Sequence, residues 1–349
     1  NKIDKIFKKE INKIKFPEIN ISKKTFEIEY DTPLYAHTTI EPLNFTVNYT
    51  DNQCEVWGPT QSQTELEFYI KELTGFSSDK IKINITSIGG SFGIKQTFDA
   101  LVQAITISKS LKKPIQVMWT REQEIQNSYP MQMNKNKIRI SVNEKGFPIQ
   151  WDHKIVNSHS FAHRDPKFKK WLDKWDWEPN TSEGFPPVYN INKFSLGNKS
   201  VDLGLVSYNF RTTGCNQNCF VIESVIDEAA SKAKIDPIDY RLMLLKNNQR
   251  HHSLLKNIAN DSNWDENLES GYGKGVAINE FMVKNTSKGR DNFGEATSIV
   301  AMIAEIEISK KGRLVINKVD CKIDCGICVN PNQVISQAEG GIMMGISML

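Results

Sequence analysis

Short segments of alternating apolar and polar residues in the first half of the chain stand next to segments with helical periodicity. The run "KIKINITSI" at 80–88 alternates and predicts a strand. Before it, residues 62–74 predict a helix that ends at Gly75, because glycine readily adopts the left-handed conformation of a helix stop. Apolar positions recur at helical spacing over 98–111, and Pro114 ends that helix before the strand-like "PIQVMWT".

The second half of the chain shows the same two periodicities in a different order. Residues 221–245 predict two helices separated at Asp236-Pro237, since proline fits the first turn of a helix. Residues 298–324 predict a β-hairpin. A helix is expected after Pro331, although glycine is costly inside a helix. Close packing against backbone or a ligand is therefore expected at Gly340, Gly341 and Gly345.

Two stretches lack a clear pattern. The basic run that opens the chain predicts a solvated helix face or a linker, so residues 1–28 are expected to be a linker or the end of a preceding domain. Residues 161–200, rich in Trp, Pro and charge, predict a loop or insertion, either near a substrate entrance or as a plain surface excursion. The whole pattern indicates an α+β fold of mixed sheets with flanking helices, with a first domain over 29–160 and a second over 201–349.

Composition narrows the class of protein. A chain of 349 residues can form about two domains, and 39% hydrophobic with 24% charged residues is typical of a globular protein. The net charge is +3, from 44 basic and 41 acidic residues, so no nucleic-acid partner is expected. No apolar stretch reaches the roughly 18 residues of a membrane span, and no signal peptide is visible.

The ends of the sequence point to a piece of a longer polypeptide. The chain begins at Asn1 rather than Met and stops in mid-pattern at "GGIMMGISML", so the second domain is expected to be truncated. The missing targeting segment leaves the compartment open, with the cytoplasm and export to the periplasm after folding as the alternatives.

The cysteines and histidines form no recognisable metal site. "CGIC" is a CxxC without a second pair, so buried small side chains are expected there rather than a zinc or redox site. The histidines of "HKIVNSHSFAHR" are expected on the surface or in loops. The low density and irregular spacing argue against a disulfide scaffold for Cys54, Cys215, Cys219, Cys321, Cys325 and Cys328.

The stretch "SIGGSFGIKQ" holds glycines at a predicted strand-to-helix turn, where backbone N–H groups suit an anion. A Walker loop needs GxxxxGK[ST], and Gly93 is followed by Ile94-Lys95-Gln96, so this motif is excluded. The spacing GGxxG also differs from the dinucleotide fingerprint GxGxxG. Alone, the loop is equally compatible with a structural turn.

Three further segments place polar or glycine residues at the ends of predicted elements. "EVWGPTQSQ" puts Gln61 between a strand and a helix, "FRTTGCNQNC" puts Arg211, Gly214 and Gln217 ahead of a helix, and "NQVISQAEGG" puts Gln337 on a helix with two glycines. Glutamine offers a donor and an acceptor together, which suits a ligand with oxo and amide groups. Each segment singly is also compatible with turn or capping chemistry.

In this order the segments resemble a known family. With "TPLYAHTTIEPLNFTV", "PIQVMWTREQEI", "ESVIDEAA…DPIDYRLMLL" and "DCGICVNPNQVISQAEGGIMMGIS", they are similar to the molybdenum-cofactor-binding large subunit of the xanthine dehydrogenase and aldehyde oxidase family. Among the bacterial molybdenum hydroxylases, the resemblance is greatest to the branch of the isoquinoline 1-oxidoreductase beta subunit. It runs from about residue 29 to the end, and it implies two cofactor-binding domains of this type.

The resemblance implies a set of site residues. Gln61 matches a glutamine that hydrogen-bonds an oxo ligand of molybdenum and, with Arg211, is expected to act in catalysis. Gln96 and Thr213 are expected at the substrate pocket. No side chain is expected to ligate the metal, which is held through the pterin dithiolene. The implied cofactor contacts are Gln61, Gly89, Gly90, Ser91, Phe92, Gly93, Arg211, Thr212, Thr213, Gly214, Gln337, Glu339, Gly340 and Gly341, the last four matching a helix start.

Departures from the family pattern narrow the expected substrate. Ser91 replaces a loop glycine, and its hydroxyl could bond the cofactor. Gln96 stands where purine-oxidising relatives carry a glutamate, and Thr213 where they carry an aromatic ring, so a xanthine-like substrate is not expected. The general-base glutamate of the family is expected in a Gly-x-Gly-Glu segment beyond Leu349.

The implied activity is oxidation of an N-heterocycle or aldehyde by water-derived hydroxylation, with a glutamate as general base. The implied cofactor is molybdopterin cytosine dinucleotide. Because the chain has no four-cysteine cluster motif, the electrons are expected to pass to [2Fe-2S] clusters on a separate small iron–sulfur subunit. One alternative is a catalytically inactive homologue that binds cofactor or partner without turnover, and another is a β-rich binding module.

Overall fold

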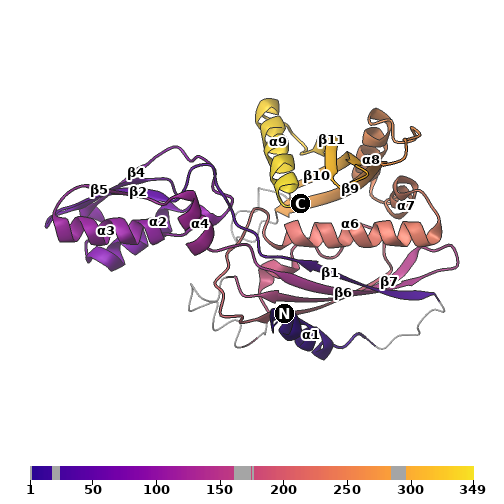
Figure 1. The fold of residues 1–349 in the computed structure, drawn as a ribbon, viewed down its shortest axis with the longest axis horizontal. Helices are drawn as coiled ribbons and strands as arrows, with labels where there is room; N and C mark the ends of the chain where they lie inside the picture. The colour runs from indigo at the N-terminus through magenta and orange to yellow at the C-terminus, as the bar shows by residue number, and fades with distance from the viewer. Residues whose placement is uncertain (1, 18–23, 161–173, 175–176, 284–295) are drawn as a thin grey trace.

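The computed structural model describes residues 2–17, 24–160, 174, 177–283 and 296–349, and the strands in this part of the chain form three sheets (Figure 1). Helices flank each sheet, so the predicted α+β class is confirmed.

A smaller lobe forms around the four-stranded sheet β4-β3-β2-β5 (Figure 1). Strands β2 and β3 pair antiparallel, and β3 and β4 pair parallel. Apolar residues buried at alternate positions of β2 join the buried faces of α2 and α3 in one core cluster. The strand predicted at 80–88, the helices predicted at 62–74 and 98–111 and the strand-like stretch from Pro114 are confirmed as β4, α2, α3 and β5. The elements of this lobe are β2 (Asn44–Tyr49), β3 (Cys54–Gly58), α2 (Gln63–Thr74), β4 (Ile81–Ile85), α3 (Asp99–Leu111), β5 (Ile115–Met118) and α4 (Arg121–Asn127), with short 3-10 helices at Ser78–Lys80 and Ile94–Gln96.

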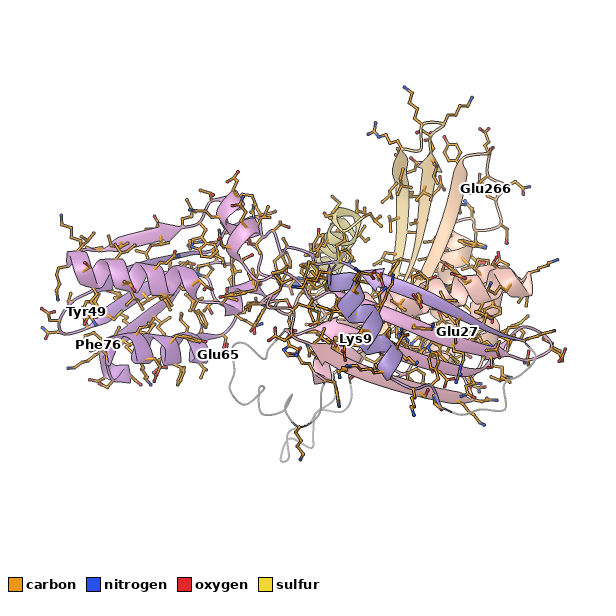
Figure 2. All side chains as sticks on the ribbon, turned by 60° about the horizontal axis from the view of Figure 1, so that its bottom comes forward. Lys9, Glu27, Tyr49, Glu65, Phe76 and Glu266 are labelled. Carbon is orange, nitrogen blue, oxygen red and sulfur yellow. The ribbon has the colours of Figure 1, made fainter. Side chains whose placement is uncertain are left out.

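A larger lobe is built on the sheet β1-β6-β7-β8, whose long strands run beneath α6 in Figure 1, while Figure 2 shows the helix of Lys9 in front of the opposite face. Helix α6 (Gly214–Ala233) covers one face of this sheet, and α1 (Lys2–Lys13) covers the other by burying Phe7 and Ile11. Of the two alternatives predicted for the opening basic run, residues 2–13 thus form the helix, with one face packed on the sheet. The strands are β1 (Thr25–Thr32), β6 (Asn134–Val142), β7 (Pro148–Ser158) and β8 (Lys193–Val201).

The expected loop over 161–200 is wrong at its C-terminal end, because β8 pairs in parallel with β7 along its length. The sequence of β8 lacks the alternation of apolar and polar residues that predicts a strand, because only Ser200 and Val201 of β8 are buried. A 3-10 turn at Pro179–Ser182 also falls in this stretch, whereas residues 161–173 and 175–176 lie outside the described part. The domain boundaries at 29–160 and 201–349 stay a prediction.

The third sheet, of order β11-β10-β9, packs on the side of α6 opposite the large sheet (Figure 1). Its strands are antiparallel, and the hairpin predicted at 298–324 is confirmed as β10 and β11. One continuous core runs from the large sheet through α6 to β9 and β10. The elements are α7 (Pro237–Leu244), α8 (Gln249–Asp261), β9 (Tyr272–Val283), β10 (Ala296–Ile308), β11 (Leu314–Asp324) and α9 (Pro331–Ser347).

A buried ion pair fixes α6 to its neighbours. Arg241 of α7 is fully buried and donates to Glu223 Oε2 of α6 over 3.0 Å and to Asp227 Oδ1 over 2.6 Å. Glu223 also accepts hydrogen bonds from Tyr189 and from the Ile278 backbone. Because each charge has partners, this network holds α6 in one position in spite of the cost of burial.

Two sequence expectations about His and Cys are wrong. His153 is buried in β7 rather than exposed, and burial lowers its pKa to about 3. Cys325 is half-buried and Cys328 exposed, so neither is a buried core side chain. His159 is half-buried, and His163 lies outside the described residues. In the part of the chain that the structure describes, no helix is both long and apolar enough to cross a membrane.

Candidate functional site

The predicted glycine loop joins β4 to the 3-10 helix at Ile94–Gln96. Its backbone has positive φ at Gly90 (91°), Phe92 (53°) and Gly93 (113°), whereas Ser91 does not. Among the described residues, no acceptor faces the N–H groups of Gly90, Ser91 and Phe92. A run of free N–H groups with alternating handedness is the geometry in which backbone binds anions.

Gln61 lies directly against this loop. Its side-chain Oε1 accepts the Gly93 backbone N–H over 3.1 Å, and its own backbone N–H donates to the carbonyl of Lys95 over 3.1 Å. The Gln61 side chain is exposed. Because its oxygen is used by Gly93, its amide N–H groups remain for a ligand.

Glu41 and Lys95 brace the glycine loop from behind. Lys95 is 1% exposed and its Nζ pairs with Glu41 Oε2. The same carboxylate accepts the Gly89 N–H over 2.7 Å, while the Glu41 N–H donates to the Gly89 carbonyl over 2.9 Å. Burial works against the charged carboxylate, but the bonds from Lys95, Gly89 and Asn44 keep the pKa of Glu41 below its usual value.

Helix α4 holds the segment that contains Glu41. Arg121 donates to the carbonyls of Thr39 and Ile40, and Glu124 accepts from the Thr39 hydroxyl over 3.2 Å. Sequence reasoning assigned no role to Glu41, Lys95, Arg121 or Glu124. These four residues do lie in the segments that carry the family resemblance, namely "TIEP", "GIK" and "WTREQE", and this position could have indicated a role.

Residues 208–214 reach the glycine loop from the large lobe. The Asn209 carbonyl is so close to Gly93 that a Cβ added to Gly93 would lie 2.0 Å from it. Tyr208 donates to Gln96 Oε1 over 3.2 Å, which places this predicted pocket residue at the same junction. The loop over Gly89–Gly93 and the segment that leads to Arg211 therefore meet.

The predicted residues Thr212, Thr213 and Gly214 form a tight turn into α6. Thr212 and Thr213 both have positive φ, 63° and 46°, which is rare for residues with a branched Cβ. Gly214 is buried, and a Cβ there would lie 2.1 Å from the Asn180 carbonyl. Helix α6 begins at Gly214, so Gln217 lies inside the helix, buried, rather than ahead of it.

Arg211 connects this turn to α9. Its Nη2 donates to Gln337 Oε1 over 3.0 Å and to the Gln337 carbonyl over 3.2 Å. Gln337 and Glu339 are exposed and lie well inside α9, not at the start of the helix as expected. Of the helix glycines, Gly341 lies beside the Arg211 guanidinium. A Cβ at Gly340 or Gly345 would meet open space, so close packing against backbone does not explain why these two positions are glycine.

Glu183 is a titratable group beside the turn that no sequence signal indicated. Burial raises the pKa of this carboxyl to about 7, and a hydrogen bond from the Gly214 N–H opposes the shift only in part. Its Oε2 is buried without a hydrogen-bond partner among the described residues.

The structure thus joins the four predicted segments through direct contacts: Gln61 to Gly93, Gly93 to Asn209, and Arg211 to Gln337. The available groups are neutral amides, free backbone N–H groups and one guanidinium, which suit a ligand rich in anionic oxygen. Within the described residues, no group of three His, Cys, Asp or Glu side chains could hold a metal ion.

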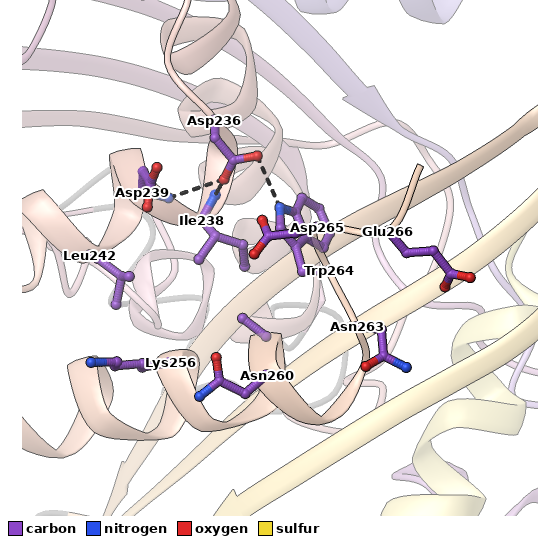
Figure 3. Close-up of a pocket in the computed structure, with 11 residues that line it drawn as sticks. Asp236, Ile238, Asp239, Leu242, Lys256, Asn260, Asn263, Trp264, Asp265 and Glu266 are labelled. Atoms are coloured by element: carbon purple, nitrogen blue, oxygen red, sulfur yellow. Dashed lines mark hydrogen bonds between the residues drawn. The ribbon is translucent and has the colours of Figure 1, made fainter. Parts of the chain in front are cut away.

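A surface hollow of ≈ 670 Å³ lies elsewhere, between α7, α8 and the turn that follows α8 (Figure 3). None of the predicted site residues lines it. Trp264 closes one side by donating to Asp236 Oδ2 over 2.9 Å, and Asp236 also caps α7. These bonds give Asp236 and Trp264 a structural role.

Comparison with known proteins gives a consistent set of relatives. Two family profiles, both described as molybdopterin cofactor-binding domain, match residues 17–245 and 202–349. The chain is 26% identical over 338 residues to the beta subunit of isoquinoline 1-oxidoreductase from Brevundimonas diminuta, which covers 95% of this chain and 41% of the relative. It is 24% identical over 335 residues to a nicotinate dehydrogenase subunit of Pseudomonas putida, covering 91% of this chain and 27% of the relative.

Solved structures share the fold at low sequence identity. The aldehyde oxidoreductase of Desulfovibrio desulfuricans has a TM-score of 0.62 at 15% identity, covering 84% of this chain and 33% of that one. The quinoline 2-oxidoreductase of Pseudomonas putida 86 has a TM-score of 0.61 at 12% identity, covering 84% and 40%. The chain spans less than half the length of each of these relatives.

Proposed function

Because the chain belongs to the molybdopterin-binding xanthine dehydrogenase and aldehyde oxidase family, we propose that the junction around Gly93 binds a molybdopterin cofactor for the oxidation of an N-heterocycle or an aldehyde. The observation that supports this most directly is the meeting of the glycine loop, Gln61, Arg211 and Gln337, which the fold brings together from four separate segments.

The residues at the junction fit such a cofactor. The free N–H groups of Gly90, Ser91 and Phe92 would bind its anionic oxygens, and Gln61 would donate its remaining amide N–H to an oxygen close to the metal. Arg211, fixed by Gln337, would place a positive charge beside the ligand. The further predicted contacts, at Gly89, Thr212–Gly214, Glu339, Gly340 and Gly341, belong to the same proposal, as does the cytosine dinucleotide form of the cofactor.

When bound, the cofactor supplies the redox centre that accepts electrons as a carbon is hydroxylated with oxygen from water. The residues at the junction would bind the cofactor and orient the substrate. Gln96, held by Tyr208, and Thr213 would face the substrate, and neither offers the charge or the aromatic face that a purine site needs. We therefore propose a substrate other than a purine.

The rest of the machinery is also part of the proposal. A separate iron–sulfur subunit with [2Fe-2S] clusters would take the electrons, and a glutamate beyond Leu349 would act as general base. The relatives from Brevundimonas diminuta and Pseudomonas putida are each named as one subunit of an enzyme, which supports a complex of several chains. The alternative is a homologue that binds cofactor or partner without turnover.

The test is metal and pterin analysis of the full-length protein purified with its partner, followed by a screen of N-heterocycles and aldehydes with an electron-accepting dye. If the proposed function is correct, we expect about one molybdenum and one pterin per chain and turnover of at least one compound. Protein without molybdenum or pterin would contradict it, and loaded protein without turnover or a Gly-x-Gly-Glu segment would favour the inactive homologue.

A further inference from the structure

His37 lies at the junction but belongs to none of the segments with a proposed ligand contact. It is 1% exposed, and its Nε2 lies 2.9 Å from the carbonyl oxygen of Asn209. A carbonyl can only accept, so Nε2 carries the proton and donates it. Burial lowers the pKa of His37 to about 4 in spite of the Asn209 and Tyr129 backbone groups, which favour the protonated ring, and the ring is therefore neutral at pH 7.

Asn209, the partner of His37, is one of the points where the two lobes touch. Its carbonyl takes the space that a Cβ on Gly93 would need. Its side-chain Oδ1 accepts from Asn180 Nδ2 over 2.7 Å, which ties it to the turn beneath Gly214. The next residue, Phe210, packs its ring against His37 at 5.2 Å between centroids. The bond from His37 is the one that acts on the Asn209 carbonyl itself, at the point where this carbonyl faces the glycine loop.

The contacts of Asn209 lead in both directions to proposed cofactor contacts. On one side, Gly93 bonds Gln61 through its N–H. On the other, Arg211 follows Asn209 by two residues and bonds Gln337. A shift of the Asn209 carbonyl would thus change the spacing between the Gln61 side and the Arg211 side.

We propose that His37 is a positioning residue, which sets the spacing between the glycine loop and the Arg211 turn by holding the Asn209 carbonyl against Gly93. This inference rests on the proposed function, because the spacing matters only if a ligand binds between the two sides. His37 touches neither ligand nor substrate in this role and acts through the Asn209 carbonyl, with a further contact to the Tyr129 backbone.

His153 provides a matched comparison within the same chain. It is also 1% exposed and neutral, but it bonds Asn136 on the neighbouring strand and Trp151 on its own strand. Both partners belong to the large sheet. Replacing His153 should therefore cost stability without changing the junction.

The test uses full-length protein with its partner and four variants: H37Q, H37N, H37L and H153L. Glutamine places an N–H donor where His37 Nε2 lies, whereas asparagine places it at the nearer ring position and leucine has none. We expect H37Q to keep molybdenum and pterin per folded chain within about twofold of the wild type. H37N and H37L should lose at least about fivefold, and H153L should lower Tm yet keep its cofactor content.

Hydrogen exchange on cofactor-free protein gives a second measurement that does not depend on loading. H37L and H37N should raise exchange in residues 89–96 and 206–214, and H37Q and H153L should not. Full cofactor content and unchanged exchange in H37L would overturn the proposal, as would equal losses in H37Q and H37N. If wild-type protein carries no molybdenum, the proposed function fails, and the exchange data alone decide whether His37 sets the spacing.

Discussion

The backbone N–H of Gly93 donates to the side-chain Oε1 of Gln61 over 3.1 Å, so one bond both orients the glutamine and fixes the end of the glycine loop. The glutamine oxygen is thereby occupied and its amide donors are directed elsewhere. This relationship separates two roles of Gln61, support of the loop and donation to a ligand, and the two can be tested separately.

Gln61→Glu and Gln61→Ala remove different groups of the Gln61 side chain. Glutamate keeps an oxygen for the Gly93 N–H but loses the amide donor, whereas alanine loses both. In full-length protein, both variants should lower kcat by about 100–1,000-fold, since removal of one preorganised donor costs that order. Steady-state rates and molybdenum content check this. Unchanged turnover in Gln61→Ala would remove Gln61 from the site.

Gly93→Ala should disrupt the junction, because its Cβ would lie 2.0 Å from the Asn209 carbonyl and its φ is 113°. We expect loss of most bound molybdenum, measured as metal per folded chain. Gly75→Ala is the control, since it also has positive φ but open space around the added Cβ. That variant should lose only about 1 kcal/mol of stability and keep its metal. Equal metal content in both variants would contradict the prediction.

Arg211→Ala should loosen α9, in which no residue is fully buried. The bonds from Arg211 to Gln337 link the helix to the turn before α6. We expect a loss of about 1 kcal/mol, or roughly fivefold in amide protection across α9, because these bonds are partly exposed. Arg250→Ala is the matched control, as it removes a pair with Asp324 outside α9. Similar exchange in α9 for both variants would argue against the link.

Breaking the buried pair of Arg241 and Glu223 should be far more costly than breaking an exposed one. Arg241→Met leaves Glu223 buried without its cation, and we expect a loss of about 3–5 kcal/mol in the free energy of unfolding. The double variant Arg241→Met, Glu223→Gln should recover part of this loss. Denaturant unfolding measures both, and a loss below about 1 kcal/mol in the single variant would contradict the prediction.

The two buried histidines should lower the free energy of unfolding as the pH drops below about 6.5, whereas Glu183, whose pKa is raised to about 7, should raise it over the same range. The pKa of His37 is lowered to about 4 and that of His153 to about 3, both by burial. At these two residues, the unfolded chain therefore binds more protons than the folded chain below the ordinary histidine pKa, and each proton favours unfolding. For His37 alone the loss reaches about 3 kcal/mol once the pH has fallen through 4.

Because Glu183 contributes equally to the wild type and to His153→Gln, the test is the difference between these two proteins: from pH 7.5 to pH 4, Tm should change less unfavourably in His153→Gln than in the wild type. His252, which lies on α8 and is not buried, offers the control substitution His252→Gln. The same change in Tm in His153→Gln as in the wild type and in His252→Gln would show that burial of His153 does not couple to pH.

Local patterning in the sequence was enough to predict much of the smaller lobe and the third sheet. The alternation at 80–88, the stop at Gly75 and the hairpin at 298–324 depend on contacts between near neighbours, which the chain itself encodes. Strand β8 was not predicted, because its residues are mostly half-buried and polar and its register is set by β7. The burial of His153 was not predicted, because a polar side chain can be buried when a partner such as Asn136 lies on the next strand.

The sequence by itself determined which residue types are available for a site: a glycine loop, two glutamines, an arginine and no metal-ligand cluster. Only the tertiary structure decided how they are used. Gly93 must be glycine because the Asn209 carbonyl arrives from the other lobe, and Gln61 is oriented because Gly93 lies within reach. His37, Glu41 and Lys95 gained their roles in the same way. Their partners are distant in sequence, so no local pattern could reveal these contacts: Glu41 and Lys95 meet within the smaller lobe, whereas His37 and Gly93 meet Asn209 only once both lobes have folded.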